Sequence, residues 1–149
     1  LQQQGKTISI AESCTGGLIA NRITNVAGAS EVFTHGFVSY SNAAKQQLLN
    51  VNAATLEQHG AVSEATAIEM AVGALAEAKA DIAISVTGIA GPGGGTDEKP
   101  VGTVWIGIAT ANNSMALKKF TPYGREIFKQ ATSQDALNLA RRSLEQGRD

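Results

Sequence analysis

The chain has 149 residues, a formal net charge of −1 and a hydrophobic fraction of 43%. This length predicts a single domain, residues 1–149, that buries about 70% of its unfolded surface. The charge balance offers no basic stripe for a nucleic acid, and no apolar run reaches the roughly 18 residues of a membrane span. A single cysteine cannot form an internal disulfide, so we expect a reducing, cytoplasmic location.

The first part of the chain alternates between strand and helix patterns. The opening LQQQG is typical of a helix that ends at a glycine C-cap, so we expect helical residues to be missing before Leu1. Residues 7–11 alternate and are β-branched, which predicts a strand, and residues 15–26 carry apolar side chains at helical spacing. Residues 32–39 predict a second strand.

Three helices are expected next. Ser41 or Asn42 is a suitable N-cap for a helix over residues 43–49, and a shorter helix is expected at residues 53–58. The clearest helical pattern of the chain follows Ser63, which is its expected N-cap.

The second part of the chain predicts a strand, a long loop, a hairpin and a helix. Residues 81–86 are mostly apolar on both faces, as in a buried central strand. A glycine-rich loop over residues 87–100 leads to a hairpin of residues 101–110 and 115–120, and residues 124–146 form the last helix. Together these elements predict a three-layer α/β/α domain with a mixed β-sheet.

Three loops that follow predicted strands are rich in Ser, Thr or Gly: ESCTGG (12–17), SYSNAAK (39–45) and TGIAGPGGGT (87–96). Ligand sites in open α/β sheets gather at the carboxyl ends of the strands. We therefore expect the three loops to line one pocket.

Ser13, in the first of these loops, has two interpretations. At the start of a helix its hydroxyl would face free N–H groups and the positive end of the helix dipole, which stabilise an alkoxide and an oxyanion. Alternatively Ser13 is only an N-cap, and Gly16 and Gly17 allow close packing. Cys14 is the rival nucleophile, but a helical neighbour points about 100° away, and it is typical of a small buried thiol.

A serine nucleophile needs a base. Neither His35 nor His59 is set near a strand-end carboxylate, so a Ser-His-Asp triad is poorly supported. Lys45 falls in the first turn of a predicted helix, where the dipole lowers the amine pKa by less than about one unit. A neutral amine would also need burial. On spacing alone, a solvated surface lysine is the simpler interpretation.

The glycines of the third loop would let backbone N–H groups approach an anion closely. A flexible hairpin loop without a ligand is the alternative. The spacing is neither a Walker loop nor a dinucleotide fingerprint. No cluster of Cys, His or carboxylate residues has metal-ligand spacing, so we expect no metal and no cofactor.

Four motifs in this order resemble the CinA C-terminal domain family: AESCTGG, GFVSYSNAAK, HGAVSEATAIEMA and DIAISVTGIAGPGGGTDEKPVGTVWIG. The likeness covers about residues 8–109, with a weaker echo in residues 124–126 and the last helix. Stand-alone members of the family are nicotinamide-nucleotide amidohydrolases. The resemblance implies an amidase that converts nicotinamide mononucleotide to nicotinic acid mononucleotide and ammonia, within pyridine-nucleotide recycling.

The resemblance also implies a serine nucleophile with a lysine partner and a threonine, which match Ser13, Lys45 and Thr87. Arg125 is either a phosphate partner or a surface residue of the last helix. The expected substrate contacts are Thr15, Gly16, Gly17, Tyr40, Gly88, Gly91, Gly93 and Gly94.

The expected partner is a small nucleotide substrate, and we expect the chain to bind neither nucleic acid nor a membrane. A homo-oligomer is possible from the sequence. Two alternatives remain at this point. One is a nucleotide-binding module without catalysis, and the other is an amidase for a different small amide.

Overall fold

The computed structural model describes residues 1–146. Its centre is a five-stranded sheet with the strand order β2-β1-β3-β4-β5. β1 is parallel to β2 and β3, whereas β4 is antiparallel to β3 and β5, so the predicted mixed sheet is confirmed. The strands are β1 (Ile8–Glu12), β2 (Phe33–Val38), β3 (Ile82–Gly88), β4 (Thr103–Thr110) and β5 (Ser114–Phe120).

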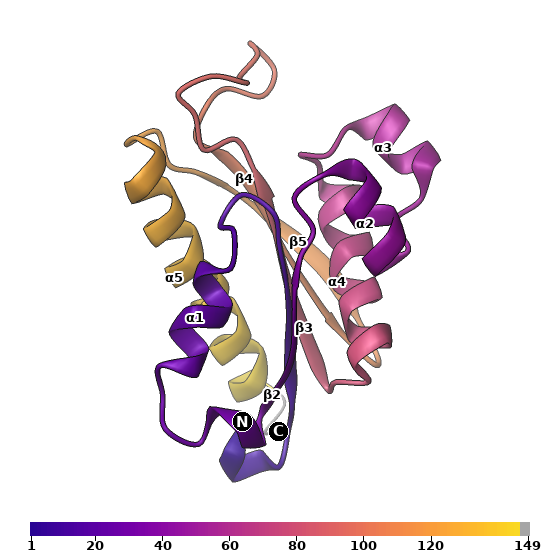
Figure 1. Ribbon diagram of the computed structural model, residues 1–149, viewed down its shortest axis with the longest axis vertical. Helices are drawn as coiled ribbons and strands as arrows, with labels where there is room; N and C mark the ends of the chain where they lie inside the picture. The colour runs from indigo at the N-terminus through magenta and orange to yellow at the C-terminus, as the bar shows by residue number, and fades with distance from the viewer. Residues whose placement is uncertain (147–149) are drawn as a thin grey trace.

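Helices cover both faces of this sheet and complete the predicted α/β/α layers (Figure 1). α1 and α5 lie on one face, called here the α5 side, and α2, α3 and α4 lie on the other, the α4 side. The helices are α1 (Leu18–Thr24), α2 (Asn42–Leu49), α3 (Ala53–His59), α4 (Glu64–Ala78) and α5 (Arg125–Gln146), with short 3-10 turns η1 (Gln2–Gln4) and η2 (Ala29–Glu31).

Two of the predicted boundaries that differ from the structure lie near the expected site. The helix predicted from Thr15 begins at Leu18, because Gly16 and Gly17 have φ angles of 60° and 99°, which a right-handed helix does not use. Thr87 was predicted to begin a loop, but it continues β3 and pairs with Trp105 of β4. Thr87 therefore lies on a strand.

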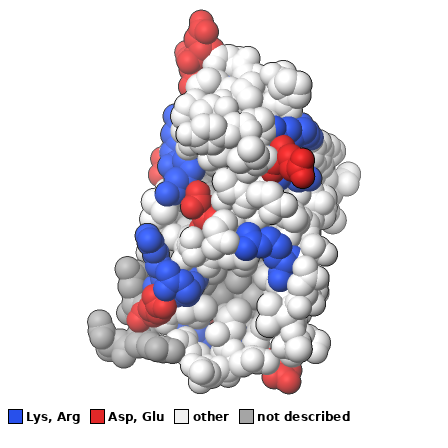
Figure 2. Space-filling view, turned by 90° about the vertical axis from the view of Figure 1, so that its left-hand side faces the viewer, with Lys and Arg blue, Asp and Glu red and all other residues white. Residues whose placement is uncertain are grey.

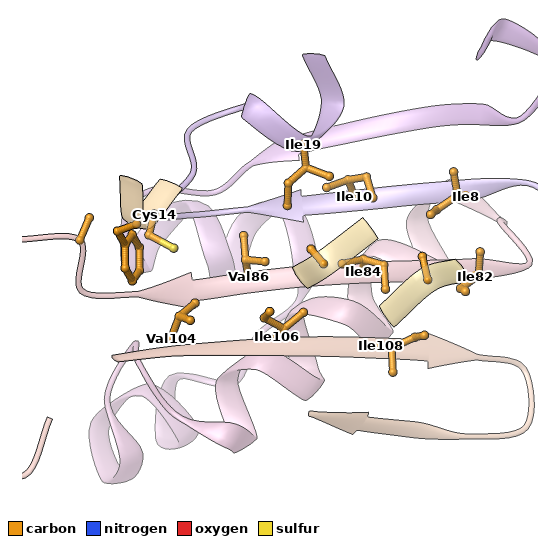
Figure 3. Packing of buried hydrophobic residues seen from close by; sticks show 14 residues of the cluster. Ile8, Ile10, Cys14, Ile19, Ile82, Ile84, Val86, Val104, Ile106 and Ile108 are labelled. Carbon is orange, nitrogen blue, oxygen red and sulfur yellow. The ribbon is translucent and has the colours of Figure 1, made fainter. Parts of the chain in front are cut away.

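The α5 side of the sheet carries the larger apolar core (Figure 3). Alternate residues of three strands point to this side and are almost fully buried, as the period of two along a strand requires. They pack with Ile19 of α1 and Phe128 of α5. The strand residues of this core are Ile8, Ile10, Ile82, Ile84, Val86, Val104, Ile106 and Ile108.

The α4 side of the sheet carries a smaller apolar cluster and buried hydroxyl groups. Ser9 and Ser85 donate hydrogen bonds to the carbonyls of Ala74 and Ala67 in α4, at 3.0 and 2.5 Å. Burying a hydroxyl is costly unless it finds a partner, so these hydrogen bonds hold α4 against the sheet. The α5 side of the sheet is therefore packed with apolar side chains, whereas the α4 side also buries hydroxyl groups.

The surface of the α5 side shows interspersed positive and negative residues (Figure 2). No continuous basic stripe is visible on this side. Within residues 1–146, no helix is both long enough and apolar enough to cross a bilayer.

Candidate active site

Ser13 and Cys14 follow β1 directly and point to opposite faces of the sheet. Along β1, Ser9 and Ala11 face α4, whereas Ile10 belongs to the core beneath α5. Successive strand side chains alternate between the faces. By this alternation Ser13 faces α4, as Ser9 and Ala11 do. Cys14 faces α5 and lies in the core with Ile10 (Figure 3). One candidate nucleophile, Ser13, therefore lies on the α4 side, and the other, Cys14, lies on the α5 side.

Lys45 meets Ser13 on the α4 side. The amine Nζ of Lys45 lies 3.0 Å from Oγ of Ser13, and it donates to the carbonyls of Ser39 at 2.8 Å and Tyr40 at 3.3 Å. Lys45 is only 1% exposed. The interpretation of Lys45 as a solvated surface residue was therefore wrong.

Helix α2 is built so that the Lys45 side chain reaches this position. Ser41 is the N-cap and accepts a hydrogen bond from the Ala44 N–H at 3.1 Å, which fixes Lys45 in the first turn. Side chains of a helix tilt back toward its N-terminus, so Lys45 points at the loop that precedes α2. The other end of α2 approaches α4 closely, because a Cβ at Gly73 would overlap the Leu49 carbonyl.

The surroundings of Lys45 favour its neutral form. Removal from water lowers the pKa of the Lys45 amine below its ordinary value. A neutral amine has two N–H groups and one lone pair. If the carbonyls of Ser39 and Tyr40 take the two N–H groups, the lone pair faces the hydroxyl of Ser13. A lone pair in this position can accept a proton from that hydroxyl.

Cys14 has the opposite character. Burial raises the pKa of its thiol to about 12, so the reactive thiolate is scarce at neutral pH. The side chain is 6% exposed and packs in the apolar core. The interpretation of Cys14 as a small buried thiol agrees with this environment.

Three hydroxyl residues form a row across the ends of the parallel strands. β1 residue Glu12 pairs with Val38 of β2 and Val86 of β3. One residue further along each strand, this register places Ser39, Ser13 and Thr87 side by side. Paired residues in neighbouring strands point to the same face, so all three belong to the α4 side.

Thr87 holds a neighbouring segment rather than the serine–lysine pair. Its hydroxyl is 1% exposed and donates to the carbonyl of Ala61, at 2.7 Å, in the turn between α3 and α4. Among the described residues, no hydrogen bond joins Thr87 to Ser13 or Lys45. Thr87 therefore ties the α3–α4 turn to the end of β3.

Glu12 was not among the predicted site residues, yet it organises the turn that presents Ser13. Its carboxylate is 1% exposed and accepts hydrogen bonds from the hydroxyl of Thr15 and from the N–H groups of Gly17, Ile19 and Ala20, at 2.5 to 3.1 Å. A negative charge at the start of α1 also suits the helix dipole. The signal in the sequence was an acidic residue at the end of a strand, immediately before a glycine-rich helix start.

Because Glu12 caps this helix, the interpretation of Ser13 as an N-cap was wrong. The residue before α1 is Gly17, and Ser13 has its hydroxyl on Lys45 instead. The N–H of Gly16 donates to the Ser13 carbonyl at 3.1 Å, and the N–H of Gly17 donates to Glu12. Two N–H groups next to Ser13, those of Cys14 and Thr15, have no acceptor among the described residues.

Tyr40 and Arg125 form a rim beside the serine–lysine pair. The guanidinium of Arg125, at the start of α5, donates to the Gly91 carbonyl at 2.8 Å and to the Tyr40 hydroxyl at 3.1 Å. The carbonyl of the same tyrosine accepts from Lys45. Arg125 therefore links the glycine-rich loop to the loop before α2, and its side chain is exposed.

The predicted glycine contacts have different environments. Gly88 is closely packed, since a Cβ there would overlap the Thr103 carbonyl. Gly93 and Gly94 are both exposed, and Gly93 has open space around it. The loop is anchored at its far end by Lys99, whose amine donates to the His59 carbonyl at 2.6 Å. The exposed glycines leave their backbone accessible to a ligand.

Among the described residues, neither histidine side chain is hydrogen-bonded to Ser13 or Lys45. His35 is exposed on the edge strand β2 and stacks on Phe37, with ring centroids 5.9 Å apart. His59 ends α3 and is exposed. Within residues 1–146, no group of three His, Cys, Asp or Glu side chains is placed to hold a metal ion.

Comparison with known proteins gives related sequences and structures. The family pattern described as the CinA C-terminal domain matches residues 1–144. A putative competence-damage inducible protein from Caldicellulosiruptor bescii is 54% identical across 97% of this chain, which spans only 35% of that protein. The nicotinamide-nucleotide amidohydrolase PncC from Escherichia coli (strain K12) is 51% identical, with 89% of this chain and 82% of that protein covered. The crystal structure of competence/damage inducible protein CihA from Agrobacterium tumefaciens matches with a TM-score of 0.90 at 46% identity, covering 93% of this chain and 85% of that one.

Proposed function

The chain belongs to the CinA C-terminal domain family, and from this premise we propose that it is a nicotinamide-nucleotide amidohydrolase. It deamidates nicotinamide mononucleotide to nicotinic acid mononucleotide and ammonia. Homology to PncC from Escherichia coli supports this substrate. The observation that carries the proposal is the buried contact, at 3.0 Å, between the Lys45 amine and the Ser13 hydroxyl.

The first half of the proposed reaction forms an acyl-enzyme. Neutral Lys45 accepts the hydroxyl proton of Ser13 while Oγ attacks the carboxamide carbon, and the carbonyl oxygen becomes an oxyanion. When the tetrahedral intermediate collapses, the carbon–nitrogen bond breaks. The leaving nitrogen takes the proton from Lys45 and departs as ammonia, and the nicotinoyl group remains esterified to Ser13.

The oxyanion needs hydrogen-bond donors that do not have to reorganise. The N–H groups of Cys14 and Thr15 are the candidates, since those of Gly16 and Gly17 are already used in the turn. A single well-placed donor of this kind contributes about 3–4 kcal/mol to transition-state stabilisation. The buried carboxylate of Glu12 holds the turn that carries these two N–H groups.

The second half of the reaction releases the acid. Lys45 is neutral again after ammonia leaves, so it takes a proton from a water molecule that attacks the ester carbon. The tetrahedral intermediate then expels Ser13 Oγ, which recovers its proton from Lys45. In this scheme Thr87 keeps the α3–α4 turn in place beside Ser13 through its hydrogen bond to Ala61, and it carries no proton.

The nucleotide phosphate binds the backbone of residues 91–96 in this proposal, next to Arg125. Exposed glycine N–H groups can approach an anion closely, and a guanidinium can bind phosphate oxygens through parallel N–H groups. Tyr40 is 59% exposed and lies beside Arg125, where its ring can line the pyridine or ribose pocket.

Arg125→Gln tests this assignment of the phosphate. We expect KM for nicotinamide mononucleotide to rise about tenfold, the scale of one lost hydrogen bond to a charged group, with a smaller change in kcat. Nicotinamide riboside, which lacks the phosphate, is the control ligand. If the substitution weakened both compounds equally, the phosphate would have to bind elsewhere.

The experiment that tests the function is an ammonia-release assay on the purified chain with nicotinamide mononucleotide, with and without a chelator. Product analysis should show nicotinic acid mononucleotide, and the chelator should have no effect. Calorimetry beside the assay separates the alternatives. Tight binding without ammonia would indicate a nucleotide-binding module, and ammonia from other amides alone would indicate a different amidase.

A further inference from the structure

The hydroxyl of Ser39 is the unusual member of the polar groups around the serine–lysine pair. Ser39 is 0% exposed, yet its Oγ has no hydrogen-bond partner among the described residues. The neighbouring hydroxyls of Ser13 and Thr87 both have partners. A buried hydroxyl without a partner destabilises the fold, so stability does not account for this hydroxyl.

The position of Ser39 connects it to Lys45. The Ser39 carbonyl accepts a hydrogen bond from the Lys45 amine at 2.8 Å, the shortest of the three that this amine makes. The register of β1 and β2 places the Ser39 side chain on the same face as Ser13, in the next place along the row. The hydroxyl and the carbonyl belong to one residue, so rotation about χ1 moves this hydroxyl relative to the amine.

The proposed reaction requires one more hydrogen-bond acceptor for Lys45 than the resting site does. Neutral Lys45 has two N–H groups, and the carbonyls of Ser39 and Tyr40 suffice for them. Once Lys45 takes the proton of Ser13, it has three N–H groups and a positive charge. At the same moment Ser13 Oγ becomes bonded to the substrate carbon and is a poorer acceptor. The third N–H must then find another oxygen within the protein, because Lys45 is only 1% exposed.

We propose that Ser39 is a positioning residue whose hydroxyl accepts the third N–H of the Lys45 ammonium while Ser13 is bonded to substrate. The proton moves from Ser13 to Lys45 and then to the departing nitrogen, and Ser39 neither gains nor loses one. Ser39 thereby stabilises the ammonium that forms when Lys45 takes the proton of Ser13, and it keeps this ammonium pointed at the leaving group. This inference depends on the serine–lysine chemistry of the proposed function.

Three substitutions separate this role from a structural one. Ser39→Ala removes the hydroxyl, while Ser39→Thr and Ser39→Val have the same shape and differ in whether a hydroxyl is present. We expect Ser39→Ala to lower kcat about tenfold with little change in KM, and not to lower the melting temperature. Ser39→Thr should retain clearly more activity than Ser39→Val.

A matched control comes from the other side of the sheet. Thr132 of α5 is 1% exposed, and its hydroxyl also has no partner among the described residues. Thr132→Val should therefore leave kcat unchanged. Unchanged kcat in Ser39→Ala, or equal losses in the Thr and Val variants, would overturn the proposal.

A second substrate keeps this test independent of the nucleotide. p-Nitrophenyl acetate can acylate an activated serine, and release of nitrophenolate reports the rate. If the chain does not hydrolyse nicotinamide mononucleotide but Ser39→Ala slows this acylation, the proposed substrate fails and the role of Ser39 stands. If the unsubstituted chain reacts with neither compound, there is no active base to position, and the inference about Ser39 is wrong.

Discussion

The neighbouring residues Ser13 and Cys14 lie on opposite faces of the sheet and have different surroundings. On the α5 side Cys14 is surrounded by isoleucine and valine side chains, and burial raises its pKa to about 12. On the α4 side Ser13 faces a buried amine whose pKa burial lowers. In each case the loss of water favours the neutral form. A neutral thiol is a poor nucleophile, whereas a neutral amine can act as a base, so in the proposed mechanism the same physical effect makes Cys14 unreactive and lets Lys45 activate Ser13.

Substitution of Ser13 tests this contrast with the largest expected effect. Ser13→Ala should reduce ammonia release by at least about 10³-fold, because the group that bonds to the carbonyl carbon is removed. Lys45 keeps its two carbonyl partners in this variant, so the melting temperature should change little. A variant that retained more than a tenth of the activity would show that the α4 side does not hold the nucleophile.

Lys45→Met should lower kcat by about 10²–10⁴-fold, the usual contribution of a general base. It should also change how stability depends on pH. The folded chain releases the Lys45 proton at a lower pH than the unfolded chain, whose lysine pKa is about 10.4. Between these two pKa values the unfolded state binds more protons, so the free energy of unfolding rises with pH there.

Denaturant titrations of both proteins across that range measure the difference. The unsubstituted chain should gain stability relative to Lys45→Met as pH rises toward 10. Parallel curves for the two proteins would mean that the amine is not desolvated in the folded state.

Glu12→Gln should act through the turn that presents Ser13. The substitution replaces a buried carboxylate that accepts from three N–H groups and one hydroxyl. We expect a loss of about 2 kcal/mol in stability, the scale of a hydrogen bond to a charged group, and a fall in kcat because the turn loosens. Asp81→Asn, at an exposed carboxylate that caps Thr7 at the other end of β1, is the control, and its kcat should not change.

Cys14→Ala should have the smallest effect on activity. Ammonia release should stay within about twofold, while stability falls by about 1 kcal/mol through lost packing in the core.

Acylation by p-nitrophenyl acetate followed by peptide sequencing offers a second comparison. The label should lie on Ser13 and be unchanged in Cys14→Ala, and a label on Cys14 would reverse the assignment of the two faces.

Much of the fold could be predicted because its signals are local. Ser63 was expected as one N-cap and either Ser41 or Asn42 as another. Ser63 and Ser41 both accept a hydrogen bond from an N–H three residues on. The mixed sheet was predicted because helices separate the first three strands, whereas a short turn joins the last two. These features depend on residues that are close in the sequence, where spacing alone carries the information.

The site could be predicted only in part, because it depends on contacts between distant residues. Lys45 is a surface lysine by its local pattern, and only the pairing of β1 with β2 brings the loop before α2 against Ser13. Glu12 is separated from its partners by a turn whose shape depends on Gly16 and Gly17. The alternation of β1, extended by two residues, would have separated Ser13 from Cys14 without any coordinates.

The most direct test of the account is an NMR titration of the Lys45 amine. With ¹⁵N-labelled lysine and the signal assigned from Lys45→Met, the pKa of this amine can be compared with the acidic limb of kcat/KM, which reports the base of the free enzyme. We predict that both fall at the same pH, below the ordinary lysine value of about 10.4. An amine that titrates at or above that value, or at a pH unrelated to the limb, would contradict the claim that neutral Lys45 activates Ser13.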